Sequence, residues 1–252
     1  MYDLAFGFRQ IPSECRGLLN VSAHHGVKAP ASILDIACGP AHHLREYARL
    51  GLSGFGVDLN REMLAYARHL SKRERLPVHL KRADMRAFEV EQKVDIAQCL
   101  FDSFSHCTTD DDAVAALRCV ARALRKGGVF VLELTHPADF FTTTSKRTVG
   151  RWSQRYPDVT VKTRFLTTNI DPIAETYVKS MTIDASYKDG RPAKHIVDRQ
   201  LHRMWLRSGI SHVAAASGAF DIVGWYGDLS PRVPLDLRMS SWRMVTVLRR
   251  RN

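Results

Sequence analysis

The chain has 252 residues, enough for one sizeable α/β domain or two small ones with a buried core. Hydrophobic residues make up 45% and charged residues 25% of the sequence, which is typical of a soluble globular protein, and no apolar run is long enough to span a membrane. The net charge of +11 leaves a nucleic-acid partner open, although residues 1–137 hold 18 Lys and Arg against 16 Asp and Glu.

The N-terminal residues and the cysteines limit where the protein works. The start, MYDLAFGFRQIPSEC, has neither a basic leader nor a cleavage site, so we expect a cytoplasmic protein with no membrane partner. Five cysteines without a C-x-x-C pair argue against a disulfide framework and against a zinc knuckle. We expect small buried thiols at Cys15, Cys38, Cys99, Cys107 and Cys119.

The first half of the chain alternates strands and helices at the spacing of βαβ units, which predicts an α/β fold with a parallel sheet and helices on both faces. The expected strands are Ile33–Cys38, Gly54–Asp58, Val78–Arg82, Val94–Leu100 and Val129–Leu134. The expected helices are Ala41–Leu50, Glu62–Glu74 and Asp111–Arg125.

After His136 and Pro137 the pattern changes to strands with period-two alternation, separated by turns at Asp171-Pro172 and Asp189-Gly190. This predicts a small antiparallel sheet inserted at residues 138–205. The chain then returns to a helix at Ser208–Ser217 and two strands, FDIVGWY and WRMVTVLRR. We therefore expect one domain from residues 1–137 and 206–252, interrupted by the insertion.

The turn after the first strand, in ILDIACGPAHH, lies where an open parallel sheet binds its ligand. A dinucleotide fingerprint G-x-G-x-x-G would need a small residue at position 42, which is His. The phasing D-x-G-x-G-x-G instead places Asp35, Ala37, Gly39 and Ala41 in register. The two alanines fit such a loop if their φ angles are negative, with positive φ left to Gly39.

That phasing resembles motif I of class I S-adenosylmethionine-dependent methyltransferases, and GVDLN, RADMR, VDIAQCLFDSFSH and LRKGGVFVLEL resemble the later motifs of that family in order. The likeness is nearest to small-molecule members with a β-sheet insertion, such as sugar-amine N,N-dimethyltransferases and glycine-type N-methyltransferases. It implies a Rossmann-like, seven-stranded, mostly parallel sheet with helices on both faces, plus the inserted antiparallel sheet. It also implies S-adenosyl-L-methionine as cofactor and S-adenosyl-L-homocysteine as product.

The resemblance assigns cofactor roles residue by residue. The loop at Asp35 to Ala41 would lie along the methionine part, Asp58 would accept the ribose hydroxyls, and Asp84 and Met85 would meet the adenine. The N-terminal segment would cover the cofactor. The implied cofactor-binding residues are Tyr2, Arg9, Asp35, Ala37, Gly39, Ala41, Asp58, Leu59, Asp84, Met85 and Cys99.

Methyl transfer needs mainly proximity and orientation, with a general base only where the acceptor carries a tightly held proton. The candidate bases are His106, just beyond the fourth expected strand, His136, just beyond the fifth, and Tyr226, which ends the penultimate strand. Adjacent histidines point about 100° apart on a helix, so His42 and His43 predict a first helical turn rather than a metal site, and we expect no metal.

The expected function is methyl transfer to a nitrogen or oxygen of a small-molecule acceptor of the natural-product or metabolite type. One alternative is a nucleic-acid methyltransferase that uses the basic insertion and the RRRN tail, although LFDSFSH lacks the base-gripping N/D-P-P-Y/F stretch. Another is a non-catalytic binding protein in which the alanines mark a loop without cofactor. The acceptor and the oligomeric state stay open.

Overall fold

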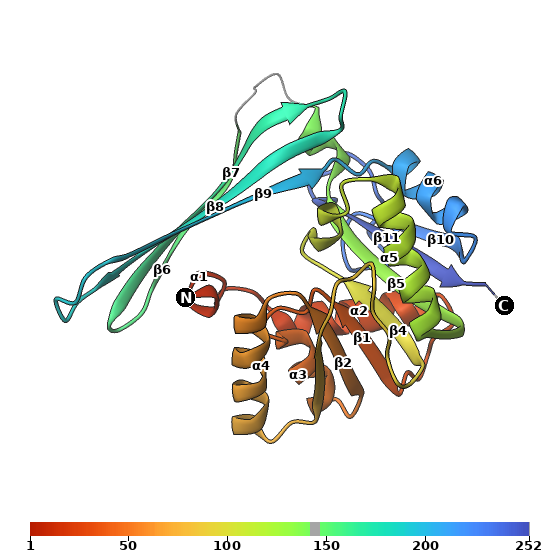
Figure 1. Cartoon of the computed structure of the whole chain (residues 1–252), viewed down its shortest axis with the longest axis horizontal. Helices are drawn as coiled ribbons and strands as arrows, with labels where there is room; N and C mark the ends of the chain where they lie inside the picture. Colours follow the sequence, from red (N-terminus) through yellow and green to blue (C-terminus); the bar gives the residue numbers. More distant parts are fainter. Residues whose placement is uncertain (142–146, 252) are drawn as a thin grey trace. The chain divides into compact units, whose positions relative to one another are not determined.

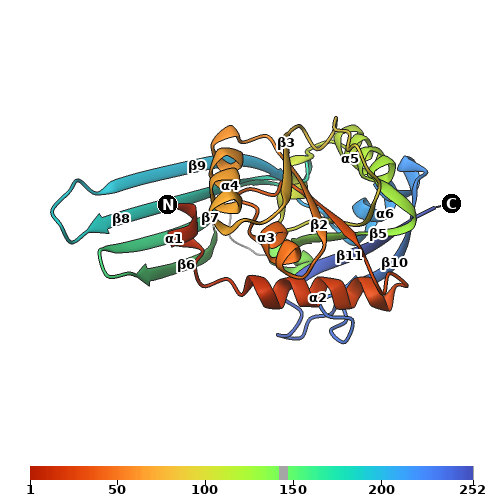
Figure 2. The same ribbon diagram turned by 90° about the horizontal axis from the view of Figure 1, so that it is seen from below.

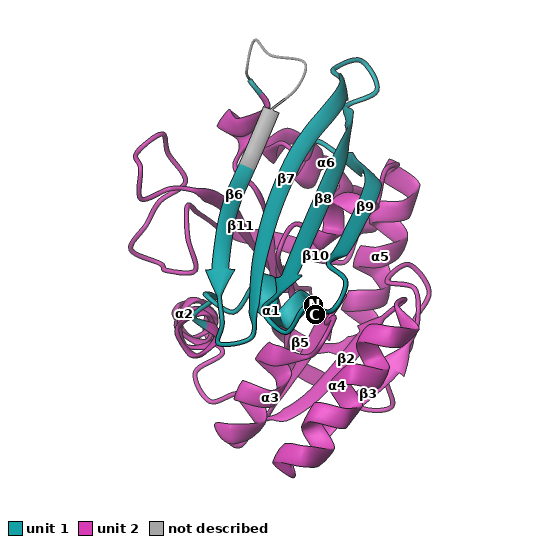
Figure 3. Ribbon diagram, turned by 90° about the vertical axis from the view of Figure 1, so that its left-hand side faces the viewer, with its two compact units in different colours: residues 1–10, 141–204 teal, residues 11–140, 205–252 magenta. Residues whose placement is uncertain are grey.

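The structure, a computed structural model, describes residues 1–141 and 147–251, so residues 142–146 of the expected insertion lie outside the described residues. The chain forms two compact units, coloured in Figure 3. Unit 1 comprises residues 1–10 and 141–204, and unit 2 comprises residues 11–140 and 205–252. In the described ranges, no helix is both long and apolar enough to cross a membrane.

Unit 2 is built on a seven-stranded sheet in the order β10-β11-β5-β4-β1-β2-β3 (Figure 1). The five strands from β3 to β5 are parallel, and β11 runs antiparallel to β5 and β10. The strands are β1 (Ser32–Ile36), β2 (Ser53–Asp58), β3 (Val78–Arg82), β4 (Val94–Cys99), β5 (Leu124–Thr135), β10 (Phe220–Tyr226) and β11 (Arg243–Arg250). The predicted seven-stranded, mostly parallel sheet is confirmed.

Helices cover both faces of this sheet, as predicted (Figure 2). Alternate residues of β1 point to opposite faces: Ile33 packs with α2, α3 and α4, whereas Leu34 packs with α5 and α6. The helices are α2 (Ile11–His24), α3 (His42–Arg49), α4 (Arg61–Glu74), α5 (Asp110–Ala123) and α6 (Arg207–Ser217), with the 3₁₀ turns η1 (Ser103–His106) and η2 (Pro137–Phe140).

Polar caps set where the helices begin and end. The Asn60 side chain accepts hydrogen bonds from the amides of Glu62 and Met63, and Thr109 accepts one from Asp112. Helix α6 ends at its C-cap Gly218, whose positive φ of 70° favours glycine. These caps place the loops at the ends of β2 and β4, where the predicted site residues lie.

Unit 1 contains a four-stranded antiparallel sheet in the order β6-β7-β8-β9 and a short helix, α1 (Tyr2–Ala5). Its strands are β6 (Arg147–Arg155), β7 (Val159–Asp171), β8 (Thr176–Tyr187) and β9 (Lys194–Arg203). Ala5 and Phe6 pack into an apolar cluster with β7 and β8. Residues 1–10, which the sequence placed with the parallel sheet, therefore group with the antiparallel one.

Two hydrogen bonds tie the N-terminal segment to the antiparallel sheet. The Trp152 indole donates to the Ala5 carbonyl at 2.6 Å, and the Tyr156 hydroxyl donates to the Leu4 carbonyl at 3.0 Å. The aromatic side chains of the insertion are thus partly used to hold this segment within unit 1.

Candidate functional site

The carboxyl ends of the parallel strands bring most of the predicted cofactor residues of unit 2 to one edge of the sheet. Ile36 of β1 is paired with Val57 of β2 and Cys99 of β4, and Asp58 is paired with Arg82 of β3. Loops that follow these strand ends are therefore neighbours, although they are far apart in sequence. An open α/β sheet binds its ligand at this edge.

The loop between β1 and α3 contains three left-handed residues. The φ angles are 56° at Ala37, 51° at Gly39 and 55° at Ala41. The condition of negative φ at the two alanines is therefore not met. The loop has to turn from the end of β1 into α3 within five residues, and it closes with a hydrogen bond of 2.9 Å from the Ala41 amide to the Cys38 carbonyl. A left-handed alanine costs about 1–2 kcal/mol, and such strain is concentrated at functional sites.

Asp58 at the end of β2 holds this loop. One carboxylate oxygen accepts the Gly39 amide at 2.7 Å, and the other accepts the Asn60 amide at 2.7 Å. A Cβ built on Gly39 would meet nothing within 4 Å, so there is open space beside the loop at this point. The predicted ribose-binding acid and the predicted loop glycine therefore adjoin a space that a ligand can enter.

Helix α3 begins at His42, which confirms that the histidine pair forms a first helical turn. Ala41 at its N-cap has no side-chain cap, so the helix leaves amide donors at the loop. The His43 ring pairs with Glu14 of α2 at 2.9 Å. An uncapped helix N-terminus favours an anion such as a carboxylate.

Arg45, one turn into α3, fixes the loop from behind. Its guanidinium donates to the Pro40 carbonyl at 2.8 Å, lies 2.9 Å from the His42 ring nitrogen, and donates to the Glu74 carboxylate at 3.2 Å. Sequence reasoning missed Arg45, because an Arg inside an amphipathic helix usually faces solvent.

Asp35 and Cys99 are buried in the strands behind the loop. Asp35 is nearly fully buried in β1, and the Cys99 side chain is completely buried in the core that faces α5. Burial raises the pKa of the Cys99 thiol, and the Asp35 charge raises it further. Cys99 can therefore meet a ligand only through its backbone.

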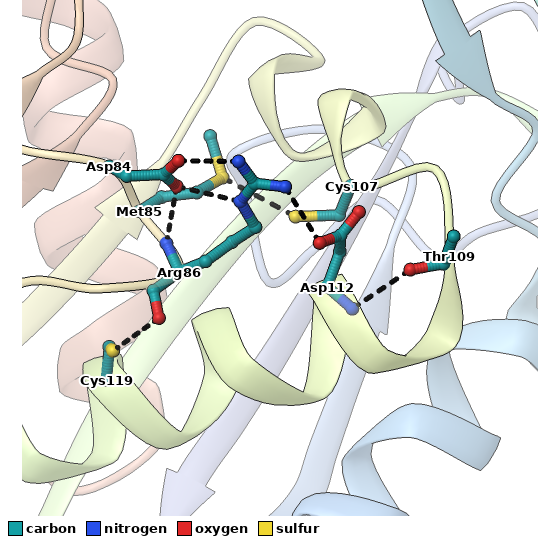
Figure 4. Close-up of polar contacts among 7 residues, drawn as sticks. All are labelled: Asp84, Met85, Arg86, Cys107, Thr109, Asp112 and Cys119. Atoms are coloured by element: carbon teal, nitrogen blue, oxygen red, sulfur yellow. Dashed lines mark hydrogen bonds and ion pairs between the residues drawn. The ribbon is translucent and has the colours of Figure 1, made fainter.

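Asp84, Met85 and Leu59 follow β3 and β2 at the same edge. The Asp84 carboxylate is paired with the Arg86 guanidinium, and the Met85 sulfur lies 3.7 Å from the Cys107 sulfur (Figure 4). Leu59 is 56% exposed, and its carbonyl accepts from Arg82 at 3.1 Å. Leu59 and Met85 therefore supply apolar surface at the edge that also carries the carboxylates of Asp58 and Asp84.

The segment after β4 adds strain that sequence reasoning missed. Phe101 and Asp102 are consecutive left-handed residues, with φ angles of 58° and 64°. One Asp102 oxygen accepts the Ser105 hydroxyl at 2.9 Å and the Thr135 amide at 3.0 Å, which joins the ends of β4 and β5. His106, at the end of η1, is exposed at this edge. Aspartate tolerates a left-handed conformation, but no sequence signal marks Phe101.

The other two candidate bases are held by the protein. The Ala138 amide donates to Nδ1 of His136 at 3.2 Å, so Nε2 carries the proton and donates to the Asp236 carbonyl at 2.9 Å. Tyr226 shares a hydrogen bond of 2.8 Å with His25, and burial raises the pKa of its hydroxyl. Of the three candidates, His106 is the exposed one.

Tyr2 and Arg9 lie in unit 1. The Tyr2 ring is 4.5 Å from the Phe6 ring, centroid to centroid, and the Arg9 amide donates to the Phe6 carbonyl at 3.0 Å. Their roles toward the cofactor stay predictions. Across the described residues, no three His, Cys, Asp or Glu side chains converge as a metal site would require.

Part of this sequence is similar to known proteins. Residues 33–128 match the model of the methyltransferase domain family. The chain is similar to a dTDP-3-amino-3,4,6-trideoxy-alpha-D-glucopyranose N,N-dimethyltransferase of Streptomyces venezuelae, 34% identical over 104 residues, which are 41% of this chain and 42% of the relative. A dTDP-3-amino-3,6-dideoxy-alpha-D-glucopyranose N,N-dimethyltransferase of Streptomyces fradiae is 34% identical over 120 residues, 48% of this chain and 45% of the relative. The chain thus spans less than half the length of these curated relatives.

Solved structures share the fold over nearly the whole chain. A S-adenosylmethionine-dependent methyltransferase from Clostridium acetobutylicum superposes with a TM-score of 0.79 and 17% identity, covering 100% of this chain and 96% of that one. The sugar N-methyltransferase KedS8 from Streptoalloteichus has a TM-score of 0.78 and 22% identity, with 100% and 93% covered. At these identities the likeness establishes the fold, including the second, antiparallel sheet.

Proposed function

We propose that this chain, whose residues 33–128 belong to the methyltransferase domain family and whose fold is that of the S-adenosylmethionine-dependent enzymes, transfers a methyl group to a small-molecule acceptor. The acceptor atom is a nitrogen or an oxygen, and an amino group on a sugar is the favoured case. The observation that carries the proposal is the contact of Asp58 with Gly39 inside a loop of three left-handed residues.

The residues at the carboxyl edge fit S-adenosylmethionine. Asp58 keeps lone pairs for two hydroxyl donors while it holds Gly39 and Asn60, as a ribose requires. The uncapped start of α3 suits the carboxylate of the methionine part. Leu59 and Met85 offer apolar surface to a purine, and Asp84 offers an acceptor to its amino group.

S-adenosylmethionine, when bound, supplies a methyl group that its sulfonium already activates. The protein's share is then orientation, and held reactants can gain several orders of magnitude in rate from proximity alone. The loop from Ala37 to Ala41 and Asp58 would fix the donor. His106, exposed after β4, would take the proton from an acceptor amine, because it lies at the surface whereas His136 and Tyr226 are buried.

The amino-sugar acceptor rests on the relatives. Three of them are named as N,N-dimethyltransferases of dTDP-linked amino sugars, and they match 40 to 48% of this chain. We further propose that the four-stranded sheet of residues 147–203 is the acceptor subdomain and that the protein acts in the cytoplasm.

Titration calorimetry with S-adenosylhomocysteine tests the cofactor site. We expect binding by the native protein and a large loss of affinity for Asp58→Ala, because a carboxylate that accepts two hydroxyl donors is replaced by a methyl group. The matched control is Asp221→Ala, which removes an exposed carboxylate of β10 that pairs with Arg251. Equal affinity for Asp58→Ala and the native protein would contradict the proposed site.

Transfer of a labelled methyl group tests the acceptor. Nucleotide-linked amino sugars, free amino sugars, transfer RNA and duplex DNA would be offered in parallel at two salt concentrations. We expect methylation of the amino sugars and none of the nucleic acids, whose binding through phosphates would also weaken steeply with salt. Methylation of RNA or DNA alone would replace the small-molecule acceptor, and no binding of S-adenosylhomocysteine would favour a non-catalytic protein.

A further inference from the structure

The guanidinium of Arg86 lies between two carboxylates at the carboxyl edge of the sheet (Figure 4). Toward Asp84, Nε is 3.0 Å from Oδ1 and Nη2 is 2.6 Å from Oδ2. On the other side, Nη1 is 2.8 Å from Oδ1 of Asp112, in the first turn of α5. Arg86 therefore connects the loop after β3 to the start of α5.

These contacts leave Asp84 one acceptor site. A carboxylate offers about four lone-pair positions. Oδ1 uses two, for the Arg86 amide at 2.9 Å and for Nε, and Oδ2 uses one, for Nη2. The remaining position is on Oδ2, and the Asp84 side chain is 26% exposed. Asp84 is thus able to accept one further hydrogen bond from a ligand.

The charge state of Asp84 suits that role. Hydrogen bonds from the Arg86 side chain lower the pKa of Asp84, more than burial raises it. The group is therefore an ionised carboxylate at neutral pH, which accepts hydrogen bonds and donates none. A ligand atom facing Oδ2 has to be a donor, such as an amino group.

The same loop is anchored at further points. The Cys119 thiol on α5 lies 3.1 Å from the Arg86 carbonyl, and the Met85 sulfur lies 3.7 Å from the Cys107 sulfur. Thr109 caps the helix that carries Asp112. The direction of the open Oδ2 position is therefore set by α5 through Arg86, and not by Asp84 alone.

Two other Asp-x-Arg turns of this chain show which contacts such a turn makes on its own. Asp189 with Arg191 and Asp236 with Arg238 form the same local pairs, with the Arg amide and guanidinium both on the Asp carboxylate. Within the described residues, their arginines form no salt bridge to a second carboxylate, and neither turn follows the end of a parallel strand. The Asp112 contact and the position after β3 distinguish Arg86.

We propose that Arg86 is a positioning residue that aims the open Oδ2 acceptor of Asp84 at the exocyclic amino group of the bound nucleoside, and so sets the preference for a 6-amino over a 6-oxo purine. The inference rests on the proposed function, because it concerns the same cofactor site. A 6-oxo purine presents a carbonyl oxygen to this acceptor, which leaves Asp84 without its donor.

The test compares the affinities of S-adenosylhomocysteine and S-inosylhomocysteine by titration calorimetry. We expect the native protein to bind the adenosyl compound at least about tenfold more tightly, as a hydrogen bond to a charged group gives. Arg86→Met should reduce this preference towards parity. Arg86→Lys should recover only part of it, since an ammonium lacks the planar fork.

Controls separate positioning from folding. Arg191→Met breaks the matching turn in unit 1 and should leave the preference unchanged. In an Asp84→Asn background, Arg86→Met should have little further effect on the preference, because the two residues act through one contact. Thermal melts without ligand report whether each variant is folded.

The outcomes are distinct. No binding of S-adenosylhomocysteine by the native protein overturns the proposed function itself. Binding without preference for the amino purine overturns the role of Arg86 and leaves the function standing. Arg86→Met in folded form with the native preference, or with both ligands weakened by the same factor, also overturns it.

Discussion

At the scale of single residues, the strain in the loop from Ala37 to Ala41 is held by its neighbours. The Asp58 carboxylate accepts a hydrogen bond from the Gly39 amide, and the Arg45 guanidinium donates one to the Pro40 carbonyl. Neither hydrogen bond requires glycine at positions 37 or 41. The alanines differ in their surroundings: Ala41 is fully buried among apolar side chains, whereas Ala37 is only half-buried. Substitutions at the two positions should therefore differ in their effect on stability.

Replacing Ala37 should change stability in a direction set by the backbone. Ala37→Gly removes about 1–2 kcal/mol of left-handed strain from the folded state. The greater conformational entropy of glycine also stabilises the unfolded state, by about 0.4–1 kcal/mol, so the free energy of unfolding should rise by about 0.5 kcal/mol. Ala37→Val should lower the free energy of unfolding by at least about 1 kcal/mol, because a β-branched residue is an outlier at this φ. Urea denaturation measures both.

Ala41→Gly is the matched comparison, since φ is 55° there as well. Burying one methyl group contributes about 0.8 kcal/mol, so its loss should cancel the relief of strain. A lower stability of Ala37→Gly than of the native protein would contradict the strain argument.

Arg45 and Arg49 provide a matched pair, because both donate to Glu74, at 3.2 Å and 2.5 Å. The Arg45 side chain is 8% exposed and that of Arg49 is 48% exposed. Arg45→Met should lower the free energy of unfolding by about 1–3 kcal/mol, because it leaves the buried Pro40 carbonyl without a donor, whereas Glu74 keeps its bond to Arg49. Arg49→Met should cost less than about 1 kcal/mol. Similar losses for the two variants would contradict a special role for the buried arginine.

At the scale of elements, periodicity predicted the sheet because its strands are nearly continuous apolar runs. Strands β3 and β10 have the predicted bounds, Val78–Arg82 and Phe220–Tyr226. Helix α2 was missed because Pro12 and Gly17 lower its helical propensity, although Cys15, Leu18 and Val21 form its buried stripe. Strand β6 was missed because its register shifts near Gly150, which interrupts the alternation.

The site was predictable to the extent that it depends on strand ends. Parallel strands end at one edge, so the spacing of Asp58 and Asp84 behind their strands located them. The hydrogen bond from Gly39 to Asp58, the contact of Arg86 with Asp112 and the hydrogen bond between His136 and Asp236 depend on partners distant in sequence. One sequence without its fold holds no signal for such partners.

Asp95 ties the starts of β1 and β4 together and should make stability depend on pH. One of its oxygens accepts from the Ala31 amide at 2.8 Å and from the Ser32 amide and hydroxyl at 3.0 Å. Burial raises the pKa of Asp95, but these hydrogen bonds and the Arg125 charge outweigh it, so the net pKa is lowered. Its contribution is therefore complete above the unfolded pKa near 3.9 and is lost as pH falls through the folded pKa.

Asp95→Asn should lower the free energy of unfolding by about 1–3 kcal/mol at pH 7. The difference in this free energy between the variant and the native protein should shrink as pH falls below about 4. Urea denaturation from pH 7 to pH 3 measures this difference. The exposed Asp221→Asn is the control and should show a small effect at every pH. A constant gap between Asp95→Asn and the native protein at all pH values would contradict the assignment.

At the scale of the whole molecule, the two units have separate apolar cores and different charges. The core of unit 1 joins α1 to β7 and β8, while the sheet of unit 2 has a core on each face. Residues 138–205 carry 12 Lys and Arg against 7 Asp and Glu, whereas residues 1–137 are nearly balanced, with 18 against 16. The proposed residues from Asp35 to Met85 all belong to unit 2.

Ligand binding should therefore appear in the thermal unfolding of unit 2. S-adenosylhomocysteine at about one hundred times its dissociation constant adds about 2.7 kcal/mol to the folded state, which corresponds to a rise of roughly 5–10 °C in the midpoint for a chain of this size. Trp205, Trp225 and Trp242 lie in unit 2 and Trp152 in unit 1, so the fluorescence of a Trp152→Phe variant reports unit 2 alone. The midpoint should rise with ligand in this variant and should not move when Asp58→Ala is added. An equal rise with Asp58→Ala present would mean that the ligand stabilises the fold from a place other than the carboxyl edge, because Asp58 is the residue that joins the loop to that edge.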